Sequence, residues 1–308
     1  MVFSIRNIEK RKLIFAFILL SGFFANSSYA SAATERKAPF ATLSSAYLDE
    51  NPNVVCLGAA ARDPLNQPCI NPQLRLSVFP SPTGAQVGQG ATLHNALCDS
   101  SAVRQEGRLT ICNFGVPVSQ AKRQVVIIGD SHANRWRTGL YKAAIQRGWN
   151  VSSIVNWGCR FSTTEISDYG SGQATRNCQQ WKDELPAWLQ RNPQVSTVFI
   201  AEVSKRSNPS KLKRAISGYQ QQWKKLPQSV EQLIVLRDNP RILISTLSCI
   251  EQAMAAGRPS GPACALPRKT VLTNYPDIAA LASLALKKPN YGVVDLSKFY
   301  CDSRVLNC

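Results

Sequence analysis

The second half of the chain shows short apolar runs separated by longer segments with helical spacing. Residues 124–129 (QVVIIG) form an unbroken, β-branched apolar run, which is typical of a strand buried on both faces of a sheet. Four further segments predict strands by their apolar runs or by their alternation: residues 149–155, 195–203, 232–236 and 291–296. The pattern therefore predicts a sheet of about five strands.

Helical segments lie between these strands. Apolar residues at helical spacing, such as Trp136, Leu140 and Ala144, predict a helix over residues 134–147. Further helices are predicted over residues 178–191, 211–226 and 276–288. Strands that alternate with helices indicate βαβ units and a parallel sheet covered on both faces. We therefore predict an α/β fold, a three-layer α/β/α sandwich whose site lies at the carboxyl ends of the strands.

Residues 33–120 differ from this pattern. They are rich in Pro, Gly, Ser and Asn, contain four cysteines and show little periodicity. We expect a loop-rich, disulfide-stapled extension that packs on a main domain over residues 121–308.

The first 32 residues have the order of a secretory signal peptide. A basic head that includes Arg6 and Lys10 precedes an apolar run over residues 13–25, and small residues follow at 28–32. The alternative is an uncleaved membrane anchor, but the run is shorter than the roughly 20 residues that a spanning helix needs. We expect a secreted or periplasmic protein.

The ten cysteines all follow this leader. An even number in an exported chain predicts disulfides. Zinc is the competing interpretation, but the chain has no C-x-x-C spacing and only two histidines, so we expect no metal and no cofactor. Taken in order, the cysteines fall into five neighbouring pairs: Cys56–Cys69, Cys98–Cys112, Cys159–Cys178, Cys249–Cys264 and Cys301–Cys308.

The chain is strongly basic, with 36 Lys and Arg against 19 Asp and Glu and a formal net charge of +17. Such a charge suits a soluble basic surface, or attraction to anionic envelope polymers and lipid head groups. Nucleic acid would be the usual partner of a basic cytoplasmic protein. The expected export and disulfides argue against it, so we expect no nucleic-acid partner.

One tetrapeptide, residues 129–132 (GDSH), carries specific chemistry. Ser131 follows the most apolar predicted strand and precedes a helix, whose first free N–H groups suit a developing oxyanion. Gly129 permits a sharp turn, and Asp130 is expected to hold that turn through backbone hydrogen bonds. The alternative is that Ser131 only caps the helix. The G-x-S-x-G elbow of α/β-hydrolases is absent.

Residues 129–136 (GDSHANRW) resemble the first block of the SGNH hydrolase superfamily, which has a flavodoxin-like fold. The similarity is greater to the SGNH domain fused to membrane acyltransferases that O-acylate bacterial surface polysaccharides. It covers roughly residues 50–308. Other matching segments are residues 56–61 (CLGAAA), 112–115 (CNFG), 157–159 (WGC), 236–240 (LRDNP) and 294–296 (VDL).

The resemblance implies roles for several residues. Ser131 would be the catalytic nucleophile, and the N–H groups of Ser131 and Gly158 would bind the oxyanion. His132 and Asn134 would belong to the turn motif. The asparagine of the superfamily's third block has no match here, and residues 202–203 (EV) stand where the fused branch usually has an Arg-Trp pair.

The resemblance also implies a histidine base in an Asp-x-x-His block beyond a cysteine pair like Cys301–Cys308. The sequence ends at Cys308, and its histidines are His94 and His132. His132 is expected to project away from Ser131. We therefore predict an SGNH domain that is C-terminally incomplete, or one whose activity is impaired.

Two function classes follow. The leading hypothesis is an exported O-acyltransferase or carbohydrate esterase that acts on acetyl-like esters of envelope polysaccharide or another glycan through Ser131. A transferase would need a membrane protein to supply the acyl donor. The alternative is a glycan-binding module that keeps the fold without the base. A nuclease-like protein is disfavoured because paired carboxylates and histidine clusters are absent.

Overall fold

The computed structural model describes residues 103–164, 172–205 and 208–302, with isolated positions 56, 69, 70, 72, 76, 78, 82, 97, 98, 170 and 308. The chain divides into two units, Met1–Asn71 and Pro72–Cys308. The first unit contains the disulfide Cys56–Cys69. The expected signal peptide and most of the expected loop-rich extension lie outside the described residues, and the following paragraphs concern the second unit.

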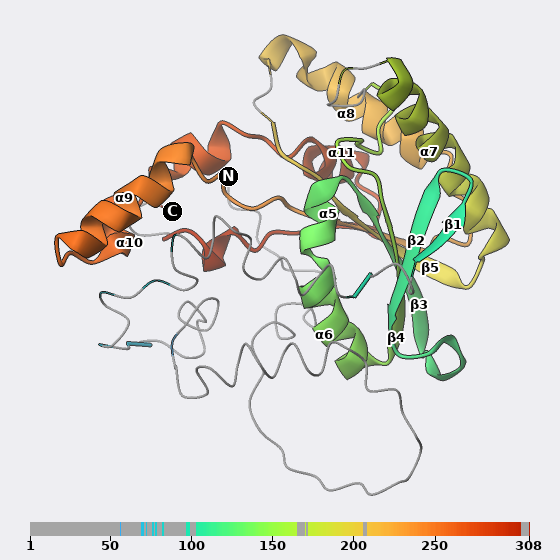
Figure 1. The fold of residues 1–308 in the computed structure, drawn as a ribbon. Coiled ribbons are helices and arrows are strands. Elements are labelled where there is room, and N and C mark those ends of the chain that lie inside the picture. The colour runs from blue at the N-terminus through green and yellow to red at the C-terminus, as the bar shows by residue number, and fades with distance from the viewer. Residues whose placement is uncertain are drawn as a thin grey trace, which may run out of the picture. The chain divides into compact units, whose positions relative to one another are not determined.

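A seven-stranded sheet forms the centre of this unit, in the order β1-β2-β4-β3-β5-β6-β7 (Figure 1). The five strands β3 to β7 are mutually parallel. The predicted α/β fold with a largely parallel sheet is therefore confirmed. The strands are β1 Val103–Glu106, β2 Leu109–Gly115, β3 Arg123–Gly129, β4 Trp149–Val155, β5 Val195–Ala201, β6 Gln232–Leu236 and β7 Tyr291–Val294.

The first two strands correct the sequence analysis, which assigned residues 103–115 to a loop-rich extension. β1 and β2 form an antiparallel hairpin, and β2 pairs antiparallel with β4, with Phe114 opposite Val151. Buried Leu109 and Ile111 alternate with exposed Thr110, as expected for a strand with one covered face. These strands were missed because one is only four residues long and both carry polar side chains. The hairpin belongs to the sheet of the main domain.

Helices cover both faces of the sheet (Figure 1). α5 (Ser131–Arg135) and α6 (Arg137–Arg147) lie on one face, where α6 packs on β4 and β2. α7 (Gly172–Arg191), α8 (Pro209–Trp223) and α11 (Ile278–Leu286) lie on the other. The large buried side chains of this second layer include Trp181, Leu185, Trp188 and Trp223.

Some elements were not predicted. α9 (Ile244–Ala255) packs against α10 (Ser260–Cys264), and a π-helix, η5, spans Lys269–Thr273. Short 3-10 helices occur at Val118–Gln120 (η4) and Ser297–Phe299 (η6). No helix in the described part of the chain is both long and apolar enough to cross a bilayer.

Four disulfides lie in the second unit and join the same cysteines as the pairs proposed from the sequence. Cys98–Cys112 fastens the chain before the hairpin to β2, and Cys249–Cys264 joins α9 to α10. Cys159–Cys178 ties the turn after β4 to α7. Because Cys159 follows Gly158 directly, this last bond fixes the turn that contains Gly158.

The order of the parallel strands locates a crevice. Numbered among themselves along the chain, they run 2-1-3-4-5, which is the flavodoxin-like order. The helices after β3 lead to β4 on one face of the sheet, and the helix after β4 leads to β5 on the other face. The two connections therefore run in opposite directions from the point between the neighbouring strands β3 and β5. Ligands of such folds bind outside the carboxyl ends of the strands at this switch point. Ser131 follows β3 directly.

Candidate active site

The turn from β3 into α5 requires glycine. Gly129 has φ +143°, and a Cβ built on it would lie 2.0 Å from the carbonyl oxygen of Ala201 on β5. The absence of a side chain therefore lets the two central strands approach where they end. The next residue, Asp130, is fully buried and caps α5.

Asp130 holds this turn with both carboxylate oxygens. Oδ1 accepts a 2.8 Å hydrogen bond from the His132 N–H, which is the usual cap of a helix start. Oδ2 accepts a 2.9 Å hydrogen bond from the Val203 N–H, just after β5. Asp130 thus fixes Ser131, the half-buried first residue of α5, relative to the neighbouring strand.

The turn after β4 lies against this one. The Asn156 N–H donates a 3.0 Å hydrogen bond to the Gly129 carbonyl oxygen, and Gly158 adopts φ +66°. Among the described residues, neither the Ser131 N–H nor the Gly158 N–H donates a hydrogen bond. The two donors named in the sequence analysis therefore have no partner among the described residues, and they stand on turns that the Asn156–Gly129 hydrogen bond joins.

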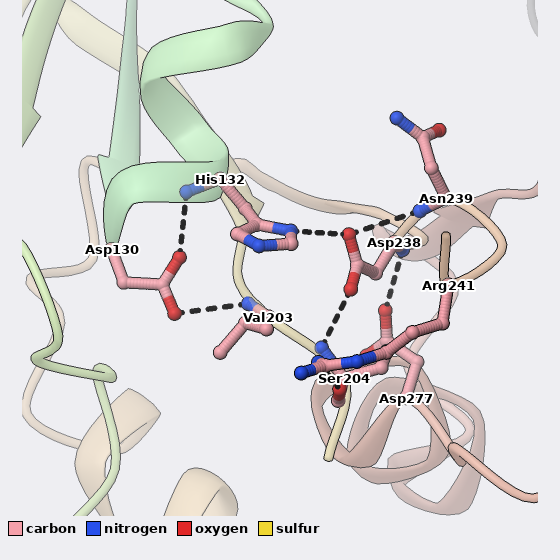
Figure 2. A network of polar contacts seen from close by, with 8 residues as sticks. All are labelled: Asp130, His132, Val203, Ser204, Asp238, Asn239, Arg241 and Asp277. Atoms are coloured by element: carbon pink, nitrogen blue, oxygen red, sulfur yellow. Dashed lines mark hydrogen bonds and ion pairs between the residues drawn. The ribbon is translucent and has the colours of Figure 1, made fainter. Parts of the chain in front are cut away.

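His132 forms the contact that the sequence analysis did not foresee. Its Nδ1 lies 2.5 Å from Oδ1 of Asp238, which follows β6 (Figure 2). The other carboxylate oxygen of Asp238 accepts a 2.7 Å hydrogen bond from the Ser204 N–H. The Asp238 N–H in turn donates to Asp277 Oδ2 at 2.9 Å. An acidic residue two positions after the end of an apolar strand was the sequence signal for Asp238.

The buried carboxylates join the ends of four elements. Asp130 and Asp238 bind the N–H groups of the consecutive residues Val203 and Ser204, so the loop after β5 is held from both sides (Figure 2). Asp277 caps α11 through Ala280. The ends of β3, β5 and β6 and the start of α11 therefore belong to one hydrogen-bonded network, which begins at Asp130 next to Ser131.

Comparison with known proteins places this geometry in a family. The family model of the SGNH domain that is fused to AT3 domains matches residues 97–308. The chain belongs to this SGNH family. A solved structure, the lipopolysaccharide acetyltransferase periplasmic domain of Salmonella ser. Paratyphi A, is similar at 13% identity with a TM-score of 0.47, over 74% of this chain and 83% of that one. No curated protein matches.

Glu202 stands next to the end of β5. This side chain is buried, and its carboxylate accepts hydrogen bonds of 2.6 Å from the Phe161 N–H and from the Tyr219 hydroxyl. Burial, aided by repulsion from Asp130, raises the pKa of Glu202 to about 8, against the lowering effect of these hydrogen bonds and of Arg160. Glu202 is therefore a buried acid that keeps its proton at neutral pH.

Two neighbouring carboxyl groups are shifted in the same direction. Burial raises the pKa of Asp277 to about 6 and also raises that of Asp130. Backbone hydrogen bonds to both side chains oppose the effect. Burial is the largest cause of the shift for all three carboxyl groups.

The protonated Glu202 predicts a pH-dependent stability. Because its folded pKa of about 8 exceeds the ordinary 4.5, its contribution is complete below about pH 4.5 and is lost as the pH rises through about 8. Glu202→Gln has the shape of the protonated acid and should flatten the fall in the free energy of unfolding across this range. A pKa shift of one unit corresponds to about 1.4 kcal/mol in the free energy of unfolding. Urea unfolding at several pH values measures this difference.

The exposed Glu251 on α9 provides the matched control. Glu251→Gln should leave the slope of stability against pH unchanged. Equal slopes for the wild type and Glu202→Gln would show that Glu202 is ionised at neutral pH and would contradict this assignment.

Other residues singled out from the sequence have different outcomes. Asn134 is buried in α5, and its Oδ1 has no hydrogen-bond partner among the described residues. His94 lies outside the described residues. Among the residues that the structure describes, no group of three or more His, Cys, Asp or Glu could hold a metal ion. Trp157, next to Gly158 in the chain, is 58% exposed.

Proposed function

We propose that this SGNH domain is an acyl-transfer enzyme, an O-acyltransferase or esterase that acts on acetyl-like esters of cell-envelope carbohydrate with Ser131 as its nucleophile. The observation that carries the proposal is the position of Ser131. It begins the helix after β3 at the switch point of the sheet, beside two unpaired backbone N–H groups.

The chemistry would proceed in two stages. The Ser131 oxygen attacks the carbonyl carbon of an acyl ester, and the N–H groups of Ser131 and Gly158 stabilise the negative charge on the carbonyl oxygen. The alcohol of the donor leaves with a proton, and Ser131 holds the acyl group as an ester. A sugar hydroxyl then takes the acyl group in a transferase, whereas water takes it in an esterase.

The setting of the reaction is part of the same proposal. The N-terminal signal pattern and the disulfides support export to the periplasm or beyond. The matching family model is that of an SGNH domain fused to AT3 domains, so a membrane acyltransferase domain would bring the acyl donor to Ser131. The net charge of +17 favours an anionic polysaccharide as the acceptor.

The test is the release or transfer of acetate on O-acetylated polysaccharide. The purified chain should release acetate, or move it to a second glycan, and Ser131→Ala should bind the same polysaccharide without turnover. Binding without turnover by the wild type would instead support the glycan-binding module. This second candidate is favoured by residues 202–203 (EV), which stand where the resemblance implies an Arg-Trp pair.

A further inference from the structure

The buried side chain of Glu202 contacts both turns that carry the two backbone donors of the proposed site. Its Oε1 accepts a 2.6 Å hydrogen bond from the N–H of Phe161, three residues after Gly158. Its Cγ lies 3.1 Å from the place that a Cβ on Gly129 would occupy. One side chain therefore packs against the turn that leads to Ser131 and binds the segment that follows Gly158.

The turn that contains Gly158 is held at both of its ends. At its start, the Asn156 N–H donates a 3.0 Å hydrogen bond to the Gly129 carbonyl oxygen. At its end, the Phe161 N–H is bound by Glu202. Both anchors belong to, or pack against, the turn that precedes the nucleophile. The position of the Gly158 N–H relative to that turn is therefore set by two contacts, and Glu202 supplies one of them.

A carboxyl group is a costly acceptor in this position. Glu202 is 4% exposed, and burial is the main cause that raises its pKa. A buried N–H needs a partner, but a neutral amide or hydroxyl can accept the same hydrogen bond without the desolvation of an acid. Arg160, the residue before Phe161, attracts the carboxyl groups of Glu202 and Asp130 and so offsets part of the cost. Groups shifted in this way are concentrated at functional sites.

We propose that Glu202 is a positioning residue that sets the spacing between the Ser131 N–H and the Gly158 N–H; this inference rests on the proposed function. Glu202 contacts no reacting atom. It acts through Phe161, whose hydrogen bond keeps the Gly158 turn in place while negative charge develops on the carbonyl oxygen of the ester. Oxyanion donors must lie about 2.7–3.1 Å from that oxygen, and a misplacement of about 1 Å can lower a rate by about 10²-fold.

The alternative is that Glu202 only satisfies polar groups of the core, the Phe161 N–H and the Tyr219 hydroxyl. Its loss would then lower the stability of the protein and leave the rate of the folded fraction unchanged. A positioning role instead predicts a loss in kcat at constant KM, because the spacing of the donors matters in the transition state. It also predicts that a substitution that keeps the acceptor keeps the rate.

The test compares two substitutions of Glu202 in the full chain, with phenyl acetate as the substrate. Glu202→Gln keeps a carbonyl oxygen for the Phe161 N–H, so its kcat should stay within about threefold of the wild type. Glu202→Leu has no acceptor, so its kcat should fall by about 10–10²-fold with KM changed by less than about twofold. The matched control is Gln222→Leu, which removes a buried 2.7 Å hydrogen bond between α8 and α7 and should keep the wild-type kcat.

A second readout does not require turnover. An alkyl fluorophosphonate reacts with activated serines, and its phosphoryl oxygen would occupy the same two N–H groups. The rate at which it modifies Ser131 should fall by the same factor as kcat in Glu202→Leu and should be unchanged in Glu202→Gln and Gln222→Leu. If Glu202→Leu fails to fold, Glu202→Asp decides, because its carboxyl group is one methylene too short to reach Phe161 and both rates should fall.

The outcomes separate this inference from the proposed function. Wild-type kcat and labelling rate in a folded Glu202→Leu, with an inactive Ser131→Ala, would overturn the positioning role and leave Ser131 as the nucleophile. Equal losses in Glu202→Gln and Glu202→Leu would also overturn it, since the hydrogen bond to Phe161 would then not be the cause. An active Ser131→Ala would overturn the proposed function itself.

Discussion

Ser131→Ala is expected to lower kcat for phenyl acetate hydrolysis by about 10⁴–10⁶-fold, because loss of the nucleophile leaves only the oxyanion donors and substrate binding. The loss should appear in kcat rather than in KM. The free energy of unfolding should change by less than about 0.5 kcal/mol, since Ser131 is half-buried and its side chain makes no hydrogen bond within the described residues. Steady-state hydrolysis and urea unfolding measure the two quantities.

The control is Ser119→Ala, an exposed serine of η4 that precedes β3 at the opposite end of the strand. It should match the wild type in both measurements. A Ser131→Ala protein that keeps more than a tenth of the wild-type rate would contradict the assignment of the nucleophile.

Gly129→Ala is expected to be the most damaging single change to the fold at this site. A methyl group would lie 2.0 Å from the Ala201 carbonyl oxygen, and the backbone φ of +143° is unfavourable for alanine. The ends of β3 and β5 must then separate, which should lower the free energy of unfolding by about 3–5 kcal/mol and abolish activity. Urea unfolding with a hydrolysis assay measures both effects.

Two other glycines separate the effect of the steric contact from the effect of the positive φ. Gly257 has φ +64° but open space around its Cβ position, and Gly261 has open space without a positive φ. Gly257→Ala should cost about 1 kcal/mol and Gly261→Ala should cost less or stabilise α10. If Gly129→Ala is no less stable than Gly257→Ala, the close approach of β3 and β5 is not required.

The parallel core was predictable because its signal is local. The runs that became β3 and β5 are apolar and β-branched, since both faces of these strands are buried. The hairpin of β1 and β2 gave no such signal, because β2 lies towards the edge of the sheet and alternates buried Ile111 with exposed Thr110. α9 was missed because, among its residues whose burial the structure describes, Ala253 alone is buried.

The site was predictable only in part, for a similar reason. The segment from Gly129 to His132 is contiguous, so its turn geometry and its chemistry could be read together. Asp238 and Asp277 come from other parts of the chain, and only the three-dimensional fold brings Asp238 to His132 and Asp277 to Asp238. The shifted pKa of Glu202 comes from burial beside Asp130, which the sequence does not encode locally.

The nucleophilic character of Ser131 is tested most directly by covalent labelling. The folded chain is treated with an alkyl fluorophosphonate, which reacts with activated serines, and the modified residue is located by mass spectrometry of its peptides. We predict a single adduct on Ser131, with none on the exposed Ser119 or Ser210. An unlabelled Ser131 in the folded protein, or an adduct on another serine, would contradict the assignment of this chain as a serine-dependent acyl-transfer enzyme.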